Sequence, residues 1–375
     1  MRFLKNKLLI SAAIGVFVTV LISILLAWNP LETVHLRLTN LFYTRTEPSS
    51  DIVIIAIDEK SMDAQSGLGV FKEWPRSYYA ELLRKIAPFV PKVIAFDLEF
   101  NKPASGLSRF RIEQLLAAEE RRERVNLSAA LKAVAAPGSH PDDLFFKQEL
   151  EKLPVIFRAA ATTFQNERGD FVYENEQPPI FSDSSEFAQT LGVEGVAFGF
   201  AQLVPDREEV FRKTLLRMTR EDGANPLAAF GFLIAQKFNP ELPSYEELSG
   251  MPVLINFAAP AGGYKRISFL DVLTGNFKKE EMENKIVLVG ATAPILQDVH
   301  IAPNSEIPMP GVEFHANIVQ QLLEEKFLHE QTNLQQIGLI AGISLASAVL
   351  LNFTPMLISV FFFFVLLIAY SIAAR

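Results

Sequence analysis

Short apolar runs alternate with helix-compatible segments through the middle of the chain. The runs occupy residues 52–57, 93–96, 155–157, 196–200, 252–257 and 286–289. Uninterrupted apolar runs are typical of strands that are buried on both faces of a parallel sheet. Helical spacing appears between several of them, at residues 77–87, 142–152, 226–237 and 311–325. The alternation predicts an α/β fold, with a mainly parallel layered sheet and helices on both faces.

A longer apolar segment precedes this domain. Residues 8–27 carry no charge, and a helix of that length crosses a hydrocarbon core of about 30 Å. Arg2, Lys5 and Lys7 come before it without any acidic residue, which predicts a cytoplasmic N-terminus over residues 1–7. A cleaved signal peptide is the alternative, but its apolar region is normally only about 7–15 residues long. We therefore expect an uncleaved transmembrane helix over residues 8–28.

Two further apolar segments end the chain, at residues 334–353 and 355–374. Thr354 and Pro355 between them are typical of the start of a new helix, which predicts a tight transmembrane hairpin. Three spans place residues 48–330 outside the cytoplasm, joined to the first span by a connecting helix over residues 29–47. An odd number of spans also leaves the last residue outside, so we expect any catalytic output domain beyond residue 375 or on a partner.

Small residues recur at every fourth position in two of the expected spans. They are Ser11, Gly15, Thr19 and Ser23 in the first, and Gly338, Gly342 and Ala346 in the second. Such stripes allow another helix to approach closely. Small residues are also common in membrane helices, so packing against a partner helix and ordinary composition both stay open. A homodimer or a larger membrane complex is the expected assembly.

Composition agrees with a membrane protein and excludes several site chemistries. The mean hydropathy of +0.20 is high for a soluble chain. The formal net charge of −8 argues against nucleic acid as a partner. The absence of cysteine excludes disulfides, thiolate metal sites, iron–sulfur clusters and cysteine nucleophiles. We expect no cofactor and no resident metal.

Residues 108–137 differ from the rest of the domain because charged side chains of both signs crowd a helix-compatible stretch. Mixed charge at helical spacing usually forms a solvated face. We interpret the segment as a projecting helix or flexible insertion, with a docking surface as the alternative.

Strand ends supply the first candidate site residues. Asp58 and Asp97 each follow an apolar run, and ligands of open α/β sheets gather at the carboxyl ends of the strands. With Glu59 or Glu99, these carboxylates could bind a hard cation or a hydroxyl-rich ligand. A capping role for each aspartate is the structural alternative.

Other candidates lie in loops and at helix starts. Thr292 belongs to a small-residue turn that could offer backbone N–H groups to an anion, with ordinary packing as the alternative. Asp298 and His300 form a possible partial metal site in a proline-bracketed loop, or an unremarkable loop pair. His315 follows Pro310 and Gly311 in a helical stretch, where packing or capping is the alternative. Arg76 is a candidate carboxylate clamp or a structural ion pair.

No nucleophile, base and orienting group occur in a recognisable catalytic arrangement. We therefore expect no catalytic residue in this chain.

Several ordered motifs resemble the type-2 CHASE domain, the cyclases/histidine-kinases-associated sensory extracellular domain. They are IVIIAIDEKS at 52–61, Trp74-Pro75-Arg76, Ile255-Asn256-Phe257, ISFLDVLTG at 267–275, KIVLVGATA at 285–293 and MPGVEFHAN at 309–317. The resemblance covers about residues 30–330. It implies a sensory domain outside the membrane, whose helices lead to a cytoplasmic cyclase, kinase or phosphodiesterase. Asn256 joins the ligand-binding candidates through its motif. Ala302 and Glu209 depart from the usual threonine and glycine.

The leading hypothesis is a multi-pass protein of the bacterial inner membrane. Its extracytoplasmic domain would bind an unknown ligand or protein and pass a conformational change through the helices. A scaffold subunit of an envelope complex is the alternative. A metal-assisted hydrolase that uses Asp58, Asp97 and Asp298, which are weak metal candidates, is a minor third.

Overall fold

The computed structural model describes residues 2–28, 40, 43, 46–105, 138–206, 208–223, 226–303, 305–328, 330–353 and 365. The chain divides into two compact units. One combines residues 1–44 with residues 328–375, and the other is formed by residues 45–327. The expected charged insertion at 108–137, almost all of the connecting segment 29–47 and almost all of the third span lie outside the described residues.

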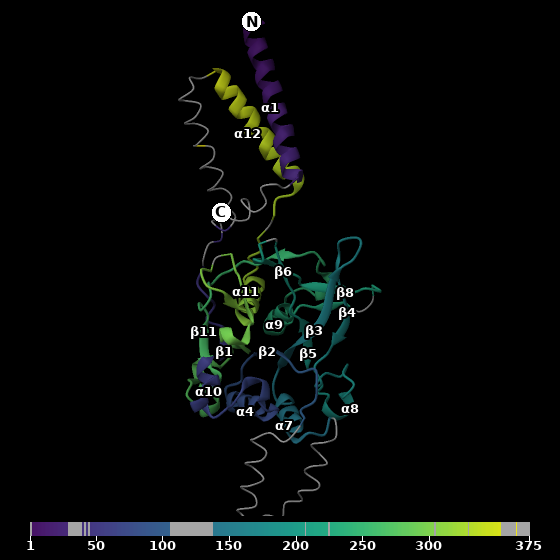
Figure 1. The fold of residues 1–375 in the computed structure, drawn as a ribbon, viewed down its shortest axis with the longest axis vertical. Coiled ribbons are helices and arrows are strands. Elements are labelled where there is room, and N and C mark those ends of the chain that lie inside the picture. The colour runs from purple at the N-terminus through teal and green to yellow at the C-terminus, as the bar shows by residue number, and fades with distance from the viewer. Residues whose placement is uncertain are drawn as a thin grey trace, which may run out of the picture. The chain divides into compact units, whose positions relative to one another are not determined.

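Six parallel strands form the centre of the larger unit (Figure 1). In spatial order they are β11 (Lys265–Ser268), β1 (Ile52–Ile57), β12 (Ile286–Ala291), β2 (Val93–Glu99), β3 (Val155–Gln165) and β5 (Ala197–Phe200). Every residue of β1 and β12 is buried, as expected for strands covered on both faces. The predicted mixed α/β architecture with a mainly parallel sheet is confirmed.

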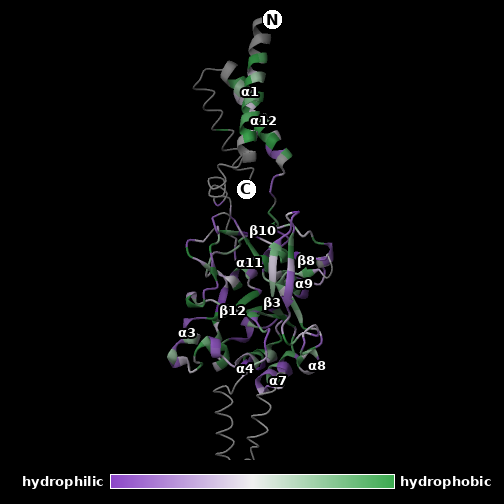
Figure 2. Cartoon of the chain, turned by 45° about the vertical axis from the view of Figure 1, so that its right-hand side comes forward, coloured by the Kyte–Doolittle hydropathy of each residue, from purple (hydrophilic) through white to green (hydrophobic). Residues whose placement is uncertain are grey.

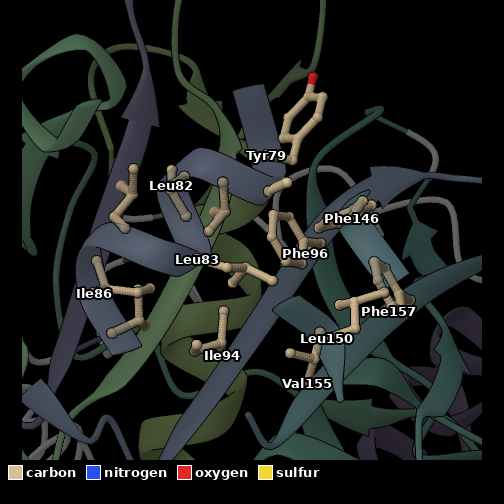
Figure 3. Close-up of a cluster of buried hydrophobic side chains, with 14 of the residues drawn as sticks. Tyr79, Leu82, Leu83, Ile86, Ile94, Phe96, Phe146, Leu150, Val155 and Phe157 are labelled. Atoms are coloured by element: carbon tan, nitrogen blue, oxygen red, sulfur yellow. The ribbon is translucent and has the colours of Figure 1, made fainter. Parts of the chain in front are cut away.

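Three helices cover one face of the sheet: α4 (Arg76–Ile86), α7 (Pro141–Leu150) and α10 (Phe269–Thr274). Figure 3 shows side chains of α4 and α7 meeting those of β2 and β3. Phe96 stacks on Phe157 with ring centroids 5.4 Å apart, and Tyr79 and Phe146 meet Phe96 edge-on and complete this aromatic cluster. Fully buried aromatic side chains contribute strongly to the hydrophobic stability of a core.

Two helices cover the opposite face: α9 (Phe230–Phe238) and α11 (Gly311–Leu323). Gly290 of β12 allows α11 to lie directly on the sheet, because a Cβ atom at this position would stand only 2.8 Å from Cβ of Val312. Residues 311–322 of α11 are all buried, including five polar side chains. A helix buried all round is normally hydrophobic, so the polar side chains of α11 need internal partners.

Smaller sheets extend this core. β3 continues beyond its parallel part and pairs in antiparallel fashion with β4 (Phe171–Gln177), which is followed by β8 (Arg217–Arg220) and β9 (Leu227–Ala228). A separate antiparallel sheet contains β10 (Val253–Leu254), β7 (Phe211–Thr214) and β6 (Leu203–Pro205). A short ribbon joins β13 (Val299–His300) to β14 (Met309–Pro310).

One predicted strand of the parallel sheet is wrong, and one strand of that sheet was not predicted. The apolar run 252–257 is not a parallel strand, because only Val253 and Leu254 pair, and they pair with β7. Asn256 instead donates its backbone N–H to Gln321 of α11, which takes this segment away from the sheet. The sequence of β11 contains no apolar run, because a strand at the edge of the sheet does not have to be apolar throughout.

The smaller unit contains α1 (Arg2–Trp28) and α12 (Asn333–Phe353), which pack against each other. Ser11 and Gly15 are buried, and a Cβ atom on Gly15 would stand 2.7 Å from Cδ2 of Leu345. The first small-residue stripe therefore faces a helix of the same chain. Gly338 and Gly342 of the second stripe are exposed.

Figure 2 colours the described parts of α1 and α12 mainly as hydrophobic. Within the described residues, none of the helices reaches the combination of length and hydropathy that a membrane crossing needs. The three expected spans remain predictions.

We expect the substitution Gly290→Ala to lower the free energy of unfolding by about 1–3 kcal/mol, the usual effect of overpacking a core. The added methyl group would overlap Val312 at the contact between β12 and α11. Gly250→Ala is the matched control, since its Cβ meets only a backbone oxygen at 4.0 Å. Chemical denaturation followed by tryptophan fluorescence measures both, and equal midpoints for the two variants would contradict the close-contact argument.

Candidate functional site

The carboxyl edge of the parallel sheet carries Asp58, directly after β1, and Asp97, near the end of β2. β12 lies between these two strands. Neighbouring strands are about 4.8 Å apart, so roughly 10 Å separates the two backbones. The two carboxylates line different cavities, which we describe in turn.

The cavity beside Asp58 has a volume of about 490 Å³, and its polar groups are engaged with each other. Asp58 caps α3 (Glu59–Met62) by accepting hydrogen bonds from the backbone N–H and hydroxyl of Ser61, and it also accepts one from Ser268. Lys60 pairs with Asp271 at 2.6 Å. The structure thus shows the capping role for Asp58.

Thr292 and Arg266 complete the lining of this first cavity. Thr292 donates backbone and hydroxyl hydrogen bonds to the carbonyl of Ile57, at 3.0 and 3.4 Å. Arg266 forms an ion pair at 2.6 Å with the buried carboxylate of Glu313. These contacts hold the cavity wall together, and the two ion pairs, Lys60–Asp271 and Arg266–Glu313, engage both lining cations.

A β-bulge positions Asp97 at the second cavity. The register of β2 and β3 runs from Phe96 opposite Phe157 to Glu99 opposite Arg158, which leaves Asp97 and Leu98 as extra residues. Bulges commonly re-aim side chains next to functional sites. Arg158 Nη1 lies 3.3 Å from Asp97 Oδ1, and Arg158 Nη2 lies 3.4 Å from Glu99 Oε1. Both distances are at the long end for charge-assisted hydrogen bonds.

Asp298 reaches the same cavity from the loop before β13. Its backbone carbonyl accepts a hydrogen bond from the N–H of Gly311, the first residue of α11. A Cβ atom on Gly311 would stand only 2.7 Å from Asp298 Oδ1, so any larger residue here would force the carboxylate to shift. His300 Nε2 lies 3.5 Å from the same carboxylate oxygen. The positive end of the α11 dipole also favours a carboxylate at this position.

His315 closes the cavity from α11, one turn after Gly311. Its Nε2 lies 3.8 Å from Asp97 Oδ1, and its ring meets Phe230 edge-on at 5.1 Å. The cavity has a volume of about 240 Å³ and is lined by Asp97, Arg158, Ala201, Gln202, Leu203, Phe211, Asp298, His300, Gly311 and His315. We call this cavity the Asp97 pocket.

Burial and neighbouring charges fix the charge states in the Asp97 pocket. Burial lowers the pKa of His315 and outweighs the attraction of Asp97, so the imidazole is neutral at neutral pH. Burial opposes ionisation of Asp298, but the hydrogen bond from His300 and the charge of Arg158 hold its pKa below the usual value. Burial likewise opposes the charge on Arg158, yet Asp97, Asp298 and Glu99 together raise its pKa.

Two polar atoms of this pocket lack hydrogen-bond partners within the part of the chain that the structure describes. They are Oδ2 of Asp97 and Nδ1 of His315, both shielded from solvent. Buried polar groups are almost always paired, because an unpaired one costs about 1–3 kcal/mol. Asp97 is only 2% exposed and His315 only 5%. Unpaired buried groups at a cavity indicate a site whose ligand supplies the missing contacts.

Two predicted site residues lie elsewhere and have structural contacts. Arg76 approaches Asp143 at 3.6 Å and donates to the carbonyl of Lys102 at 3.0 Å, so it forms an ion pair with α7 and not with a strand-end aspartate. Asn256 donates its side-chain amide to the carbonyl of Lys326 at 3.1 Å, close to the end of α11.

The metal-assisted hydrolase has no structural support. Asp97 and Asp298 share a pocket, but Asp58 lines another. Among the described side chains, no group of three or more His, Asp or Glu has a metal-binding arrangement. Sequence reasoning missed Arg158, although this charged residue directly follows the apolar run 155–157, where the predicted strand ended; in the structure it lies within β3. Considering basic as well as acidic residues at the end of each predicted strand would have identified it.

The far end of α11 holds the segment through which the chain enters the larger unit. Gln320 accepts a hydrogen bond from the N–H of Ser49 and donates one to the carbonyl of Glu47, both at 3.0 Å. Gln321 pairs similarly with Leu254 and Asn256. A helix of 13 residues is about 20 Å long. One rigid element therefore joins the Asp97 pocket to residues 47–49.

Comparison with known proteins gives one match. The family model of the CHASE2 domain matches residues 16–351, which is most of the chain. Neither a curated protein nor a solved structure matches the chain.

The neutral state of His315 predicts a pH-dependent stability. Its folded-state pKa lies below the ordinary value of 6.5, so as the pH falls through 6.5 the unfolded chain takes up a proton that the folded chain does not. The free energy of unfolding should therefore fall below pH 6.5, by at most about 1.4 kcal/mol per pH unit for this group. Chemical denaturation from pH 7.5 to 5 measures the slope.

His315→Gln is the matched variant, because its side chain does not titrate. We expect a shallower slope in this variant over the same range. Asp298 stabilises the folded state above its unfolded pKa, and this stabilisation is lost only as the pH falls below about 3.8. It therefore stays constant over the pH range in which His315 is tested. Equal slopes for the variant and the unmodified chain would show that His315 takes up its proton equally in both states.

Proposed function

Because the chain belongs to the CHASE2 domain family, we propose that its larger unit is the extracytoplasmic sensory domain of a membrane signalling protein. CHASE2 domains form a family of extracellular sensory domains, which are not themselves catalytic. A sensory role for this chain is consistent with that membership. Beyond family membership, we propose a ligand pocket, a position in the membrane and an output.

The observation that carries the proposal is the position of α11. Its first turns supply Gly311 and His315 to the Asp97 pocket, and its last turn supplies Gln320 to residues 47 and 49. In sequence, those residues connect the sensory unit to the N-terminal helix. A ligand that changes the position of the first turns of α11 would therefore change the position of this connection.

The flanking helices support a membrane location. Residues 8–27 carry no charged side chain, and α1 and α12 expose large apolar side chains such as Leu9, Phe17 and Leu334. Such exposure is unusual for a helix pair in water and is typical of contact with lipid. We place the N-terminus in the cytoplasm and residues 48–330 outside it, in a multi-pass protein of the bacterial inner membrane.

Signalling requires that ligand binding favours one of two states of the domain. A ligand shifts such an equilibrium only through its different affinities for the two states. In the Asp97 pocket, the affinities differ if the ligand can form hydrogen bonds to Asp97 Oδ2 and His315 Nδ1 in only one position of α11. The output would then be a change in the packing of α1 against α12, read by a catalytic domain or a partner protein.

A disulfide reporter in the helix pair tests the proposal. The chain contains no cysteine, so the pair Gly15→Cys and Leu345→Cys provides the only thiols. The leucine substitution also removes the nearest atom that a Cβ atom on residue 15 would meet, Cδ2 of Leu345 at 2.7 Å, and leaves Cα of residue 345 at 3.1 Å. We expect His315→Ala to change the rate of crosslinking in membranes several-fold, since coupling free energies between sites are typically about 1–3 kcal/mol.

Two further variants make the result specific. Ser77→Ala, a buried substitution on the opposite face of the sheet, should leave the rate unchanged. Gln320→Ala should remove the response to His315→Ala, because it breaks the hydrogen bonds to residues 47 and 49. A crosslinking rate that is the same in all variants would reject the sensory proposal in favour of a static scaffold.

A further inference from the structure

We propose that the Asp97 pocket binds a small molecule through a protonated amino group, which contacts Asp97 and Asp298. This inference rests on the proposed sensory function and names the chemical class of its ligand. The pocket itself is defined by geometry that is independent of that function.

The fixed charges of the pocket favour a cation. Asp97 and Asp298 line it together with a single guanidinium, that of Arg158. Glu99 lies outside the lining and draws the same guanidinium away from the pocket, at 3.4 Å. His315 is neutral for the reason given above. The lining also contains the imidazole of His300, which contacts Asp298. The two carboxylates outnumber the one guanidinium, so the pocket attracts a ligand cation.

The unpaired buried atoms require hydrogen-bond donors. Oδ2 of Asp97 is an acceptor for which the described residues supply no donor. If the Nε2–H of His315 faces the Asp97 carboxylate, Nδ1 of the same ring is also an acceptor. An ammonium group has three donors and no acceptor. It therefore matches both atoms, and its approach to Asp97 would displace Arg158 toward Glu99.

A metal ion fits the same charge less well. Ca²⁺ and Mg²⁺ require about six or more oxygen ligands at short and regular distances. The described residues contain no cluster of three metal-binding side chains, and Arg158 lies directly beside Asp97. An ammonium tolerates a neighbouring guanidinium because its hydrogen bonds need only individual acceptors.

The volume and the aromatic lining limit the rest of the ligand. About 240 Å³ is smaller than the usual site for a drug-sized molecule, about 300–1,000 Å³, so this pocket fits a group the size of an amino acid or a short amine. Asp97, Arg158 and Asp298 also line a neighbouring cavity of about 490 Å³. Phe211 lines the pocket and can face either an alkyl chain or the cation itself. Arg158 can receive a carboxylate, so the amine source is either a simple alkylamine or an amino acid.

Binding to the full chain in lipid nanodiscs, measured by calorimetry at pH 7.5, tests the inference. The probes are n-butylamine, 1,4-diaminobutane, glycine and L-alanine, with n-butanol, acetate and CaCl₂ as comparisons. We expect binding of at least one amine-bearing probe and none of n-butanol or acetate. Binding of the amino acids alone would assign their carboxylate to Arg158, and binding of the alkylamines alone would assign a simple amine.

The variants Asp97→Asn and Asp298→Asn keep the size of each side chain and remove its charge. Each should weaken amine binding about tenfold or more, the loss expected of one hydrogen bond to a charged group. Asp271→Asn, the same change in the other cavity, should leave the affinity unchanged. Two pocket variants are used so that a folding defect in one does not decide the result.

Failure of this inference differs from failure of the sensory proposal. No binding of any amine, equal binding by all variants, or binding of CaCl₂ in place of amines would overturn the ligand class. The crosslinking response to His315→Ala would be unaffected by that result. Conversely, an amine that binds through Asp97 without changing the crosslinking rate would support the ligand class and reject the signalling role.

Discussion

The burial of a polar helix is the constraint on which most of this structure depends. Residues 311–322 of α11 are all buried, yet five of them have polar side chains: Glu313, His315, Asn317, Gln320 and Gln321. Each of these side chains loses its water and must find a protein partner. Four of them do: Glu313 pairs with Arg266, Asn317 accepts the N–H of Ala259, and the two glutamines bind the chain segments on either side. The helix is thereby fixed in position by polar contacts, as well as by its contact with Gly290.

The same constraint explains why the two cavities differ. Around Asp58, both lining cations are held in ion pairs, so a ligand that binds Lys60 or Arg266 would first have to break Lys60–Asp271 or Arg266–Glu313. Around Asp97, the ion pairs are long, and two buried atoms have no partner among the residues that the structure describes. A ligand can gain contacts in the second cavity without first removing strong ones. Volume alone would have favoured the first cavity, which is about twice as large.

The sequence was sufficient for the buried strands and for most helices, because these positions are decided by apolar runs and helical spacing. The sequence did not predict the segments whose position depends on tertiary packing. The apolar run 252–257 predicts a buried strand, but the backbone N–H of Asn256 donates a hydrogen bond to Gln321 of α11, and the segment does not join the parallel sheet. β11 is polar and short, and only its pairing with β1 makes it a strand. Asp97, Asp298 and His315 were identified one by one from their local positions. Their assembly depends on a bulge in β2 and on Gly311, which no spacing rule reveals.

The contact of Val312 with Gly290 lies at the first turn of α11 and leaves no room for displacement toward the sheet. Under the proposed signalling role, we expect α11 to tilt about this contact. With a rise of about 1.5 Å per residue, His315 lies about 4.5 Å from this pivot and Gln320 about 12 Å. A small movement of His315 toward a ligand would therefore produce a movement more than twice as large at Gln320. Since Gln320 is bonded to backbone atoms of residues 47 and 49, that movement would pass directly into the chain that leads to the first helix.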